Sequence, residues 1–109
     1  MSYDVWMTID TGGPDPAEVY SAGNMTSNVA PMWRHAGADV AEMHGKTGAE
    51  CIPILEAGLS HMRHPDNAAT YRAMNPSNGW GSHDGACEFI ERILAGCRAH
   101  PRATVHVSR

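Results

Sequence analysis

The two ends of the chain alternate between hydrophobic and polar side chains. Hydrophobic residues occupy every odd position from Tyr3 to Ile9, and mostly polar residues occupy the even positions between them. Residues 103–108 repeat this alternation. A period of two is typical of a strand with one buried face. We therefore expect a strand at each end of the chain, and we expect the two strands to pair.

Two longer segments place hydrophobic residues at helical intervals, and we expect helices over residues 48–63 and from about residue 83 to residue 99. Thr47 and Glu50 have the spacing of a capping box before the first helix. Pro53 predicts a kink or an irregular first turn in it, because proline lacks the N–H that this turn needs. Either Ser82 or Asp84 can cap the second helix.

Weaker patterns fill the rest of the chain. Residues 11–16 read as a turn, residues 18–25 as a second strand, residues 39–44 as a single turn and residues 75–81 as a loop. Asn28 can cap a short helix that ends at Gly37, and another short helix covers residues 66–74. These elements predict an α+β fold in which a small, mainly antiparallel sheet pairs the N- and C-terminal strands and carries three or four helices on one face.

Length and charge narrow the classes of protein. With 109 residues the chain forms one domain, residues 1–109. The net charge of −4 comes without a basic stripe, so we expect no general nucleic-acid binding. There is no signal-like or membrane-spanning apolar run, which predicts a cytoplasmic protein with no membrane partner. Three cysteines without C-x-x-C spacing predict buried thiols and not a disulfide or zinc site.

Polar residues crowd three places where helices are expected to begin. The first cluster is Asn24, Thr26 and Asn28, which point the same way if the segment is extended. Their donors and acceptors suit a nucleobase edge, a ribose or a peptide backbone. Capping and turn formation are the competing explanation for these side chains.

The second cluster contains Lys46 and Thr47. It lacks the first glycine of a phosphate-binding loop, because Val40 stands there, so we do not expect a nucleotide triphosphatase. Lys46 beside the free N–H groups of a helix start could still hold one phosphate or carboxylate. The alternative is that Thr47 only caps the helix and Lys46 is solvated.

The third cluster runs from Trp80, which lies between two glycines, to His83 and Asp84. A tryptophan in such a loop either stacks on a ligand or folds the loop back onto the core. Trp33 and Trp6 raise the same question. We count Trp33, Trp80 and His83 as candidate ligand-binding residues.

The sequence supports a catalytic or metal-binding role less than it supports ligand binding. His61 and His64 form an i,i+3 pair that could share a metal, but no third ligand accompanies them. Cys87 lies on the apolar stripe of its helix, which favours an inert thiol over a nucleophile beside His83. We therefore assign no catalytic residue, no metal and no cofactor.

Several motifs occur together: Ser-Tyr-Asp-Val at residues 2–5, N-x-T-x-N at residues 24–28, Pro-Met-Trp at residues 31–33, G-K-T-G-A-E-x-I-P at residues 45–53, and a late amphipathic helix followed by His-Pro at residues 100–101. Together they resemble a family of small uncharacterised bacteriophage and prophage proteins. The resemblance spans most of the chain but departs from the family over residues 64–86. It implies a viral accessory protein, a class that commonly works by binding.

The residues and the resemblance together predict a non-enzymatic protein that binds a small anionic ligand, such as a nucleotide signal of host defence. Docking of a host protein through the same surface is the alternative. A metal-dependent hydrolase and a structural virion component are further candidates. A ligand-sequestering protein of this size is expected to form a homo-oligomer, because a deep pocket forms more easily between subunits.

Overall fold

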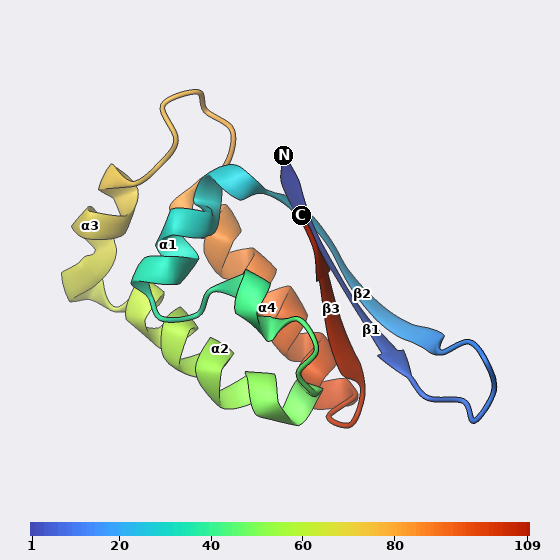
Figure 1. Ribbon diagram of the computed structural model, residues 1–109. Helices are drawn as coiled ribbons and strands as arrows, with labels where there is room; N and C mark the ends of the chain where they lie inside the picture. The colour runs from blue at the N-terminus through green and yellow to red at the C-terminus, as the bar shows by residue number, and fades with distance from the viewer.

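The computed structural model describes all 109 residues and shows a three-stranded antiparallel sheet with helices on one face (Figure 1). Its strands are β1 (Ser2–Ile9), β2 (Ala17–Thr26) and β3 (Thr104–Ser108), in the order β2-β1-β3. The first and last strands pair, so the two ends of the chain lie side by side. The predicted α+β fold is confirmed.

Two long helices and two short ones connect β2 to β3. They are α1 (Ala30–His35), α2 (Gly48–Arg63), α3 (Ala68–Ala73) and α4 (His83–Ala99). Single 3-10 turns at Ser27–Val29, Val40–Met43 and Pro65–Asn67 join them. No helix has the length and the hydrophobicity that a membrane crossing requires.

The strand register sorts the side chains of β1 onto two faces. Tyr3, Val5 and Met7 are buried beneath the helices, and the even positions lie on the helix-free face. Ile9 is the exception among the odd positions, with 41% of its surface exposed. It is exposed because the β1–β2 hairpin extends beyond β3, whose pairing with β1 ends at Thr8 (Figure 1).

Trp33 lies at the centre of the core and is fully buried. Its ring stacks on Phe89 of α4 and meets the ring of Tyr3 edge-on. Its indole N–H donates to the backbone oxygen of Ala86, at 3.2 Å. Trp33 is therefore a structural residue, and the prediction that it contacts a ligand is wrong.

Three helix starts show which predicted caps form. The capping box of Thr47 and Glu50 is present, and Ser82 rather than Asp84 caps α4. Asn28 does not cap the turn before α1. Instead, the hydroxyl oxygen of Thr26 accepts from the backbone N–H of Asn28.

Pro53 does not break α2, which runs from Gly48 to Arg63 with the proline inside it. Pro53 and Ala49 are both exposed. The carbonyl oxygen of Ala49 that the proline leaves without a donor therefore faces solvent, where water can bond it.

Candidate functional site

A cavity of about 490 Å³ lies where β2 runs into the turn before α1, at the end of the sheet that contains the chain termini. Its lining residues are Met1, Ser2, Asn24, Thr26, Asn28, Asn78 and Trp80. The first polar cluster of the sequence and Trp80 of the third therefore meet in space. Asn28 and Trp80 are 52 positions apart in the chain.

The strand register places the first part of this lining. Thr26 lies opposite Ser2 and Asn24 lies opposite Asp4, so these four side chains share the helix-free face. The amide nitrogen of Asn24 donates to Oδ1 of Asp4, at 3.0 Å. This bond fixes the carboxamide and leaves its carbonyl oxygen without a protein partner.

The loop before α4 supplies the second part. Asn28 reaches it with its amide nitrogen, which donates to the backbone oxygen of Trp80 at 3.3 Å. Gly81 permits the close approach. Its φ is +103°, and a Cβ there would lie 2.7 Å from Val29 and 2.8 Å from Thr26. Only glycine fits this position without displacing the loop.

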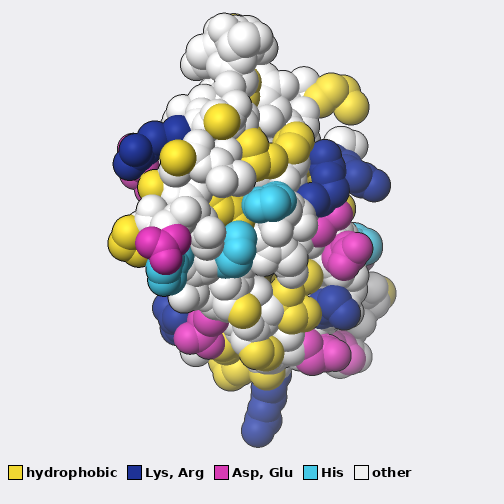
Figure 2. Space-filling view, turned by 90° about the vertical axis from the view of Figure 1, so that its left-hand side faces the viewer, with side chains coloured by type: hydrophobic (Ala, Val, Ile, Leu, Met, Phe, Trp, Pro, Cys, Tyr) yellow, Lys and Arg dark blue, Asp and Glu magenta, His cyan; other side chains and the backbone are white.

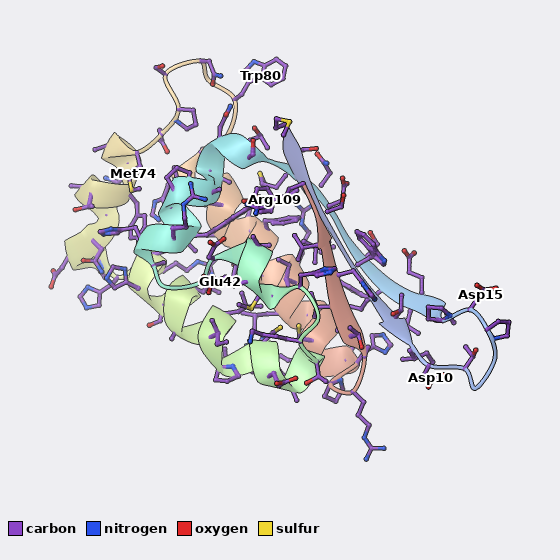
Figure 3. All side chains as sticks on the ribbon, in the orientation of Figure 1. Asp10, Asp15, Glu42, Met74, Trp80 and Arg109 are labelled. Carbon is purple, nitrogen blue, oxygen red and sulfur yellow. The ribbon has the colours of Figure 1, made fainter.

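Trp80 projects from the loop at the same end of the molecule as the start of β1 (Figure 3). It is 71% exposed. The side-chain oxygen of Asn78 accepts from the backbone N–H of Trp80, at 2.9 Å, which stabilises the turn that presents the indole. An indole held in solvent in this way is a ready surface for stacking.

The hydrogen-bonding groups that remain free in the cavity are both donors and acceptors. The hydroxyl of Thr26 can donate, because its oxygen already accepts from the backbone. Asn24 and Asn28 use their amide nitrogens within the protein and leave carbonyl oxygens free. Asn78 uses its oxygen and leaves its NH₂ free. No lysine, arginine or carboxylate side chain lines the cavity.

Lys46 and Thr47 do not belong to this site. The backbone oxygen of Lys46 accepts from Val105, and Thr47 forms a bridge with Thr104 at the far end of β3. Thr104 lies opposite Thr8, six positions along β1 from the residue that lines the cavity. At about 3.3 Å per residue the two places are roughly 20 Å apart.

The backbone donors of the anion-binding site expected at the start of α2 already bond to acceptors within the protein. All four of the first N–H groups have acceptors at 2.9–3.2 Å. Those of Gly48, Ala49, Glu50 and Cys51 bond to the carbonyl oxygens of Ala103 and Pro101 and to the hydroxyl and carbonyl oxygens of Thr47. The N–H and hydroxyl of Thr47 also bond the Glu50 carboxylate, which lowers its pKa. These N–H groups are therefore not free to hold a phosphate beside Lys46 and Thr47.

His83 is directed away from Trp80. Its Nε2 donates to the backbone oxygen of Met62 at 2.7 Å, and its ring stacks on that of Tyr71 with centroids 5.1 Å apart. It lines a separate hollow of about 650 Å³ between α2, α3 and α4. His83 thus joins three helices, and the structure does not place it with the cavity residues.

The histidine pair of α2 is split between two local partners. His61 shares a 2.6 Å hydrogen bond with the hydroxyl of Tyr71, and Nδ1 of His64 accepts from the backbone of Asp66. Figure 2 shows histidines gathered on this side of the molecule, but no three metal-ligating side chains come together. Cys87 is buried, and burial raises the pKa of its thiol.

Ser2, Asn78 and the supporting Asp4 were not predicted from the sequence. Asn78 carried a signal, because its loop is built from turn formers that need a reason to be ordered. Ser2 and Asp4 carried none, since only the register of β1 against β2 brings them to the site. No family model, curated protein or solved structure matches the chain.

Proposed function

We propose that this protein is a non-enzymatic binding protein that sequesters a neutral polar ring compound, a sugar or a nucleobase, in the cavity beside Trp80. One observation carries the proposal. Neutral donors and acceptors from three segments, residues 1–2, 24–28 and 78–80, line one cavity together with an indole that is 71% exposed. Such a site stacks the flat face of a ring on the aromatic and reads its edge with a few placed polar groups.

The charge of the site favours a neutral ligand over the anionic one expected from the sequence. No lysine or arginine lines the cavity; the one cation among its lining residues is the α-ammonium group of Met1, and the carboxylate of Asp4 bonds to Asn24 of the same lining. A nucleotide could enter with its base, but no lysine or arginine of the lining would meet its phosphate. Binding should therefore depend little on salt, because no ion pair forms with the ligand.

The resemblance to phage proteins supports an accessory role, in which the bound compound is a signal or substrate withheld from the host. Docking of a host protein is a second candidate, because Met1 and Trp80 are two of the three exposed large hydrophobic residues and line the same cavity. Exposed aromatic anchors of this kind are typical of protein interfaces.

A thermal-shift screen tests the proposal with neutral monosaccharides, nucleosides and the corresponding nucleotides. A binder should stabilise the fold by about 2.7 kcal/mol at a concentration of one hundred times Kd. A nucleoside and its nucleotide should bind alike. Trp80→Ala should abolish the shift, and the control Lys46→Ala should keep it. A screen without any stabilising compound would overturn the proposal and favour host-protein docking.

A further inference from the structure

The helix-free face of the sheet presents a second tryptophan, Trp6, which the cavity does not include. Its indole stacks on the ring of His106 in β3, with centroids 5.4 Å apart and planes 16° from parallel. A 2.7 Å hydrogen bond to Thr8 and an edge-on contact with His44 hold His106 in place. Trp6 is therefore fixed in orientation although it is only half-buried.

One face of the Trp6 indole remains open. His106 covers the face turned toward β3, and the opposite face is turned toward β2. The residue across from Trp6 on β2 is Ser21, which is small and exposed. The hydroxyl oxygen of Ser21 accepts from the backbone of Gly23, so it lies along its own strand. Ser21 therefore presents no ring and no long side chain to this side of the indole.

Polar side chains connect Trp6 to the cavity. The pair of Asp4 and Asn24 lies two positions from Trp6 along β1, on the same face of the sheet, and Ser2 with Thr26 follows. From Ser2 to Trp6 the strand spans about 13 Å. The helix-free face thus carries a polar track that ends in an aromatic platform at each side, Trp80 at one and Trp6 at the other.

We propose that the cavity and this track form one extended site for a neutral oligosaccharide, with one sugar ring stacked on Trp80 and another on Trp6. This inference rests on the proposed function and selects the sugar from its two ligand classes. The C–H face of a sugar ring packs against an indole, while its hydroxyls both donate and accept. The Asp4 carboxylate accepts from such hydroxyls, and the free oxygen of Asn24 does the same.

Charge separates a sugar chain from a nucleic acid on this surface. The charged residues of the three strands are Asp4 and Glu18, both of them negative. Glu18 lies opposite Thr8 and thus shares the helix-free face. An open sheet with aromatics could also stack the bases of a single strand, but it would need cations along the backbone of that strand. Here the phosphates would meet carboxylates.

A glycan array carrying neutral oligosaccharides, sialylated oligosaccharides and single-stranded oligonucleotides tests the inference. We expect neutral glycans to bind, and the strongest series is then titrated from one to six rings by calorimetry. Affinity should rise about tenfold or more until the chain reaches both tryptophans and should then level off. Capture of oligonucleotides in place of neutral glycans would overturn the inference.

Variants on the track locate the second platform. Trp6→Leu should remove the gain with chain length and leave single-ring binding intact, whereas Trp6→Phe should restore part of the gain. Ser21→Tyr should block the same step from an exposed position without removing any core contact. Trp80→Ala should weaken every length, and Ile9→Ala, on the other face of β1, is the matched control.

Three outcomes distinguish this inference from the proposed function. If single rings bind through Trp80 but neither chain length nor Ser21→Tyr matters, the extended site is wrong and the cavity stands. If nucleosides bind and no glycan does, the sugar assignment is wrong and the cavity again stands. If no compound binds, both the extended site and the proposed function are wrong.

Discussion

The side chain of Asn28 donates a hydrogen bond to the backbone oxygen of Trp80, at 3.3 Å and across 52 positions of the chain. This bond joins the start of α1 to a loop whose exposed tip carries the indole. Together with the bonds that Asn75 and Asn78 accept from His83 and Trp80, it orders the loop of residues 75–82. The cavity depends on that arrangement, because five of its seven lining residues come from the two segments that the bond connects.

Asn28→Ala should loosen the loop while the core stays intact. The bond is exposed, so we expect the free energy of unfolding to fall by less than about 1 kcal/mol. The free energy of ligand binding at the cavity should fall by more than the free energy of unfolding does. Hydrogen exchange of the backbone amides at residues 77–81 should become faster. Asn67→Ala is the matched control, because it removes another exposed side-chain bond, to the backbone of His61, at a distance from the cavity. Equal effects of the two variants on binding would contradict this account.

Gly81→Ala should displace the loop from α1. The new methyl group would lie 2.7 Å from Val29, at a φ of +103° that alanine rarely adopts. Gly79→Ala separates the two causes, since Gly79 has a φ of +76° but no atom within 4 Å of the new Cβ. Both variants should lose about 1 kcal/mol of stability to backbone strain. Only Gly81→Ala should also lose ligand binding, and calorimetry with chemical denaturation measures both quantities.

Local patterns predicted most of the fold because the physics behind them is local. Alternation in residues 3–9 and the capping box at Thr47 depend on neighbours within a few residues, and both are confirmed. The function of the α2 start was not predictable in this way. Its N–H groups bond to carbonyl oxygens of Pro101 and Ala103, more than 50 residues away, and no spacing in the sequence reveals such partners.

In the candidate site, too, local spacing predicted some residues correctly and could not predict those that tertiary packing places. Asn24 and Thr26 face one side because they alternate in a strand, as the sequence suggested. Trp33 and Trp80 both stood near polar helix starts, yet one is fully buried and the other is 71% exposed. The difference comes from tertiary packing, since Trp33 meets Phe89 of a distant helix.

Thr47→Ala should destabilise the fold by about 1 kcal/mol and leave ligand binding unchanged, since the residue caps α2 and lies far from the cavity. The bonds from Thr47 lower the pKa of Glu50 from its ordinary value of 4.5. A lowered carboxyl pKa contributes stability above the unfolded pKa, and this is lost as the pH falls through the folded pKa. The stability gap between wild type and variant should therefore narrow in acid, as urea denaturation at pH 7 and pH 3 can show. A gap that widens on acidification would contradict the assigned bond.

Substitution of the buried tryptophan should destabilise the fold strongly, whereas substitution of the exposed one should hardly change its stability. Trp33→Ala removes a fully buried ring and should cost about 3–5 kcal/mol, enough to unfold much of a small domain. Trp80→Ala should change the midpoint of thermal unfolding by little, because the indole is mostly in solvent. Circular dichroism melts of the two variants measure the difference. A large loss of stability in Trp80→Ala would show that the indole is a structural plug.

The most direct test of the central claim is a two-dimensional ¹H–¹⁵N NMR titration of the labelled protein with neutral monosaccharides and nucleosides. We predict shifts confined to the indole N–H of Trp80, the side-chain amides of Asn24, Asn28 and Asn78, and the backbone around them. These shifts should be absent from Trp80→Ala. Shifts centred on residues 46–50, or no shifts with any compound, would contradict the account.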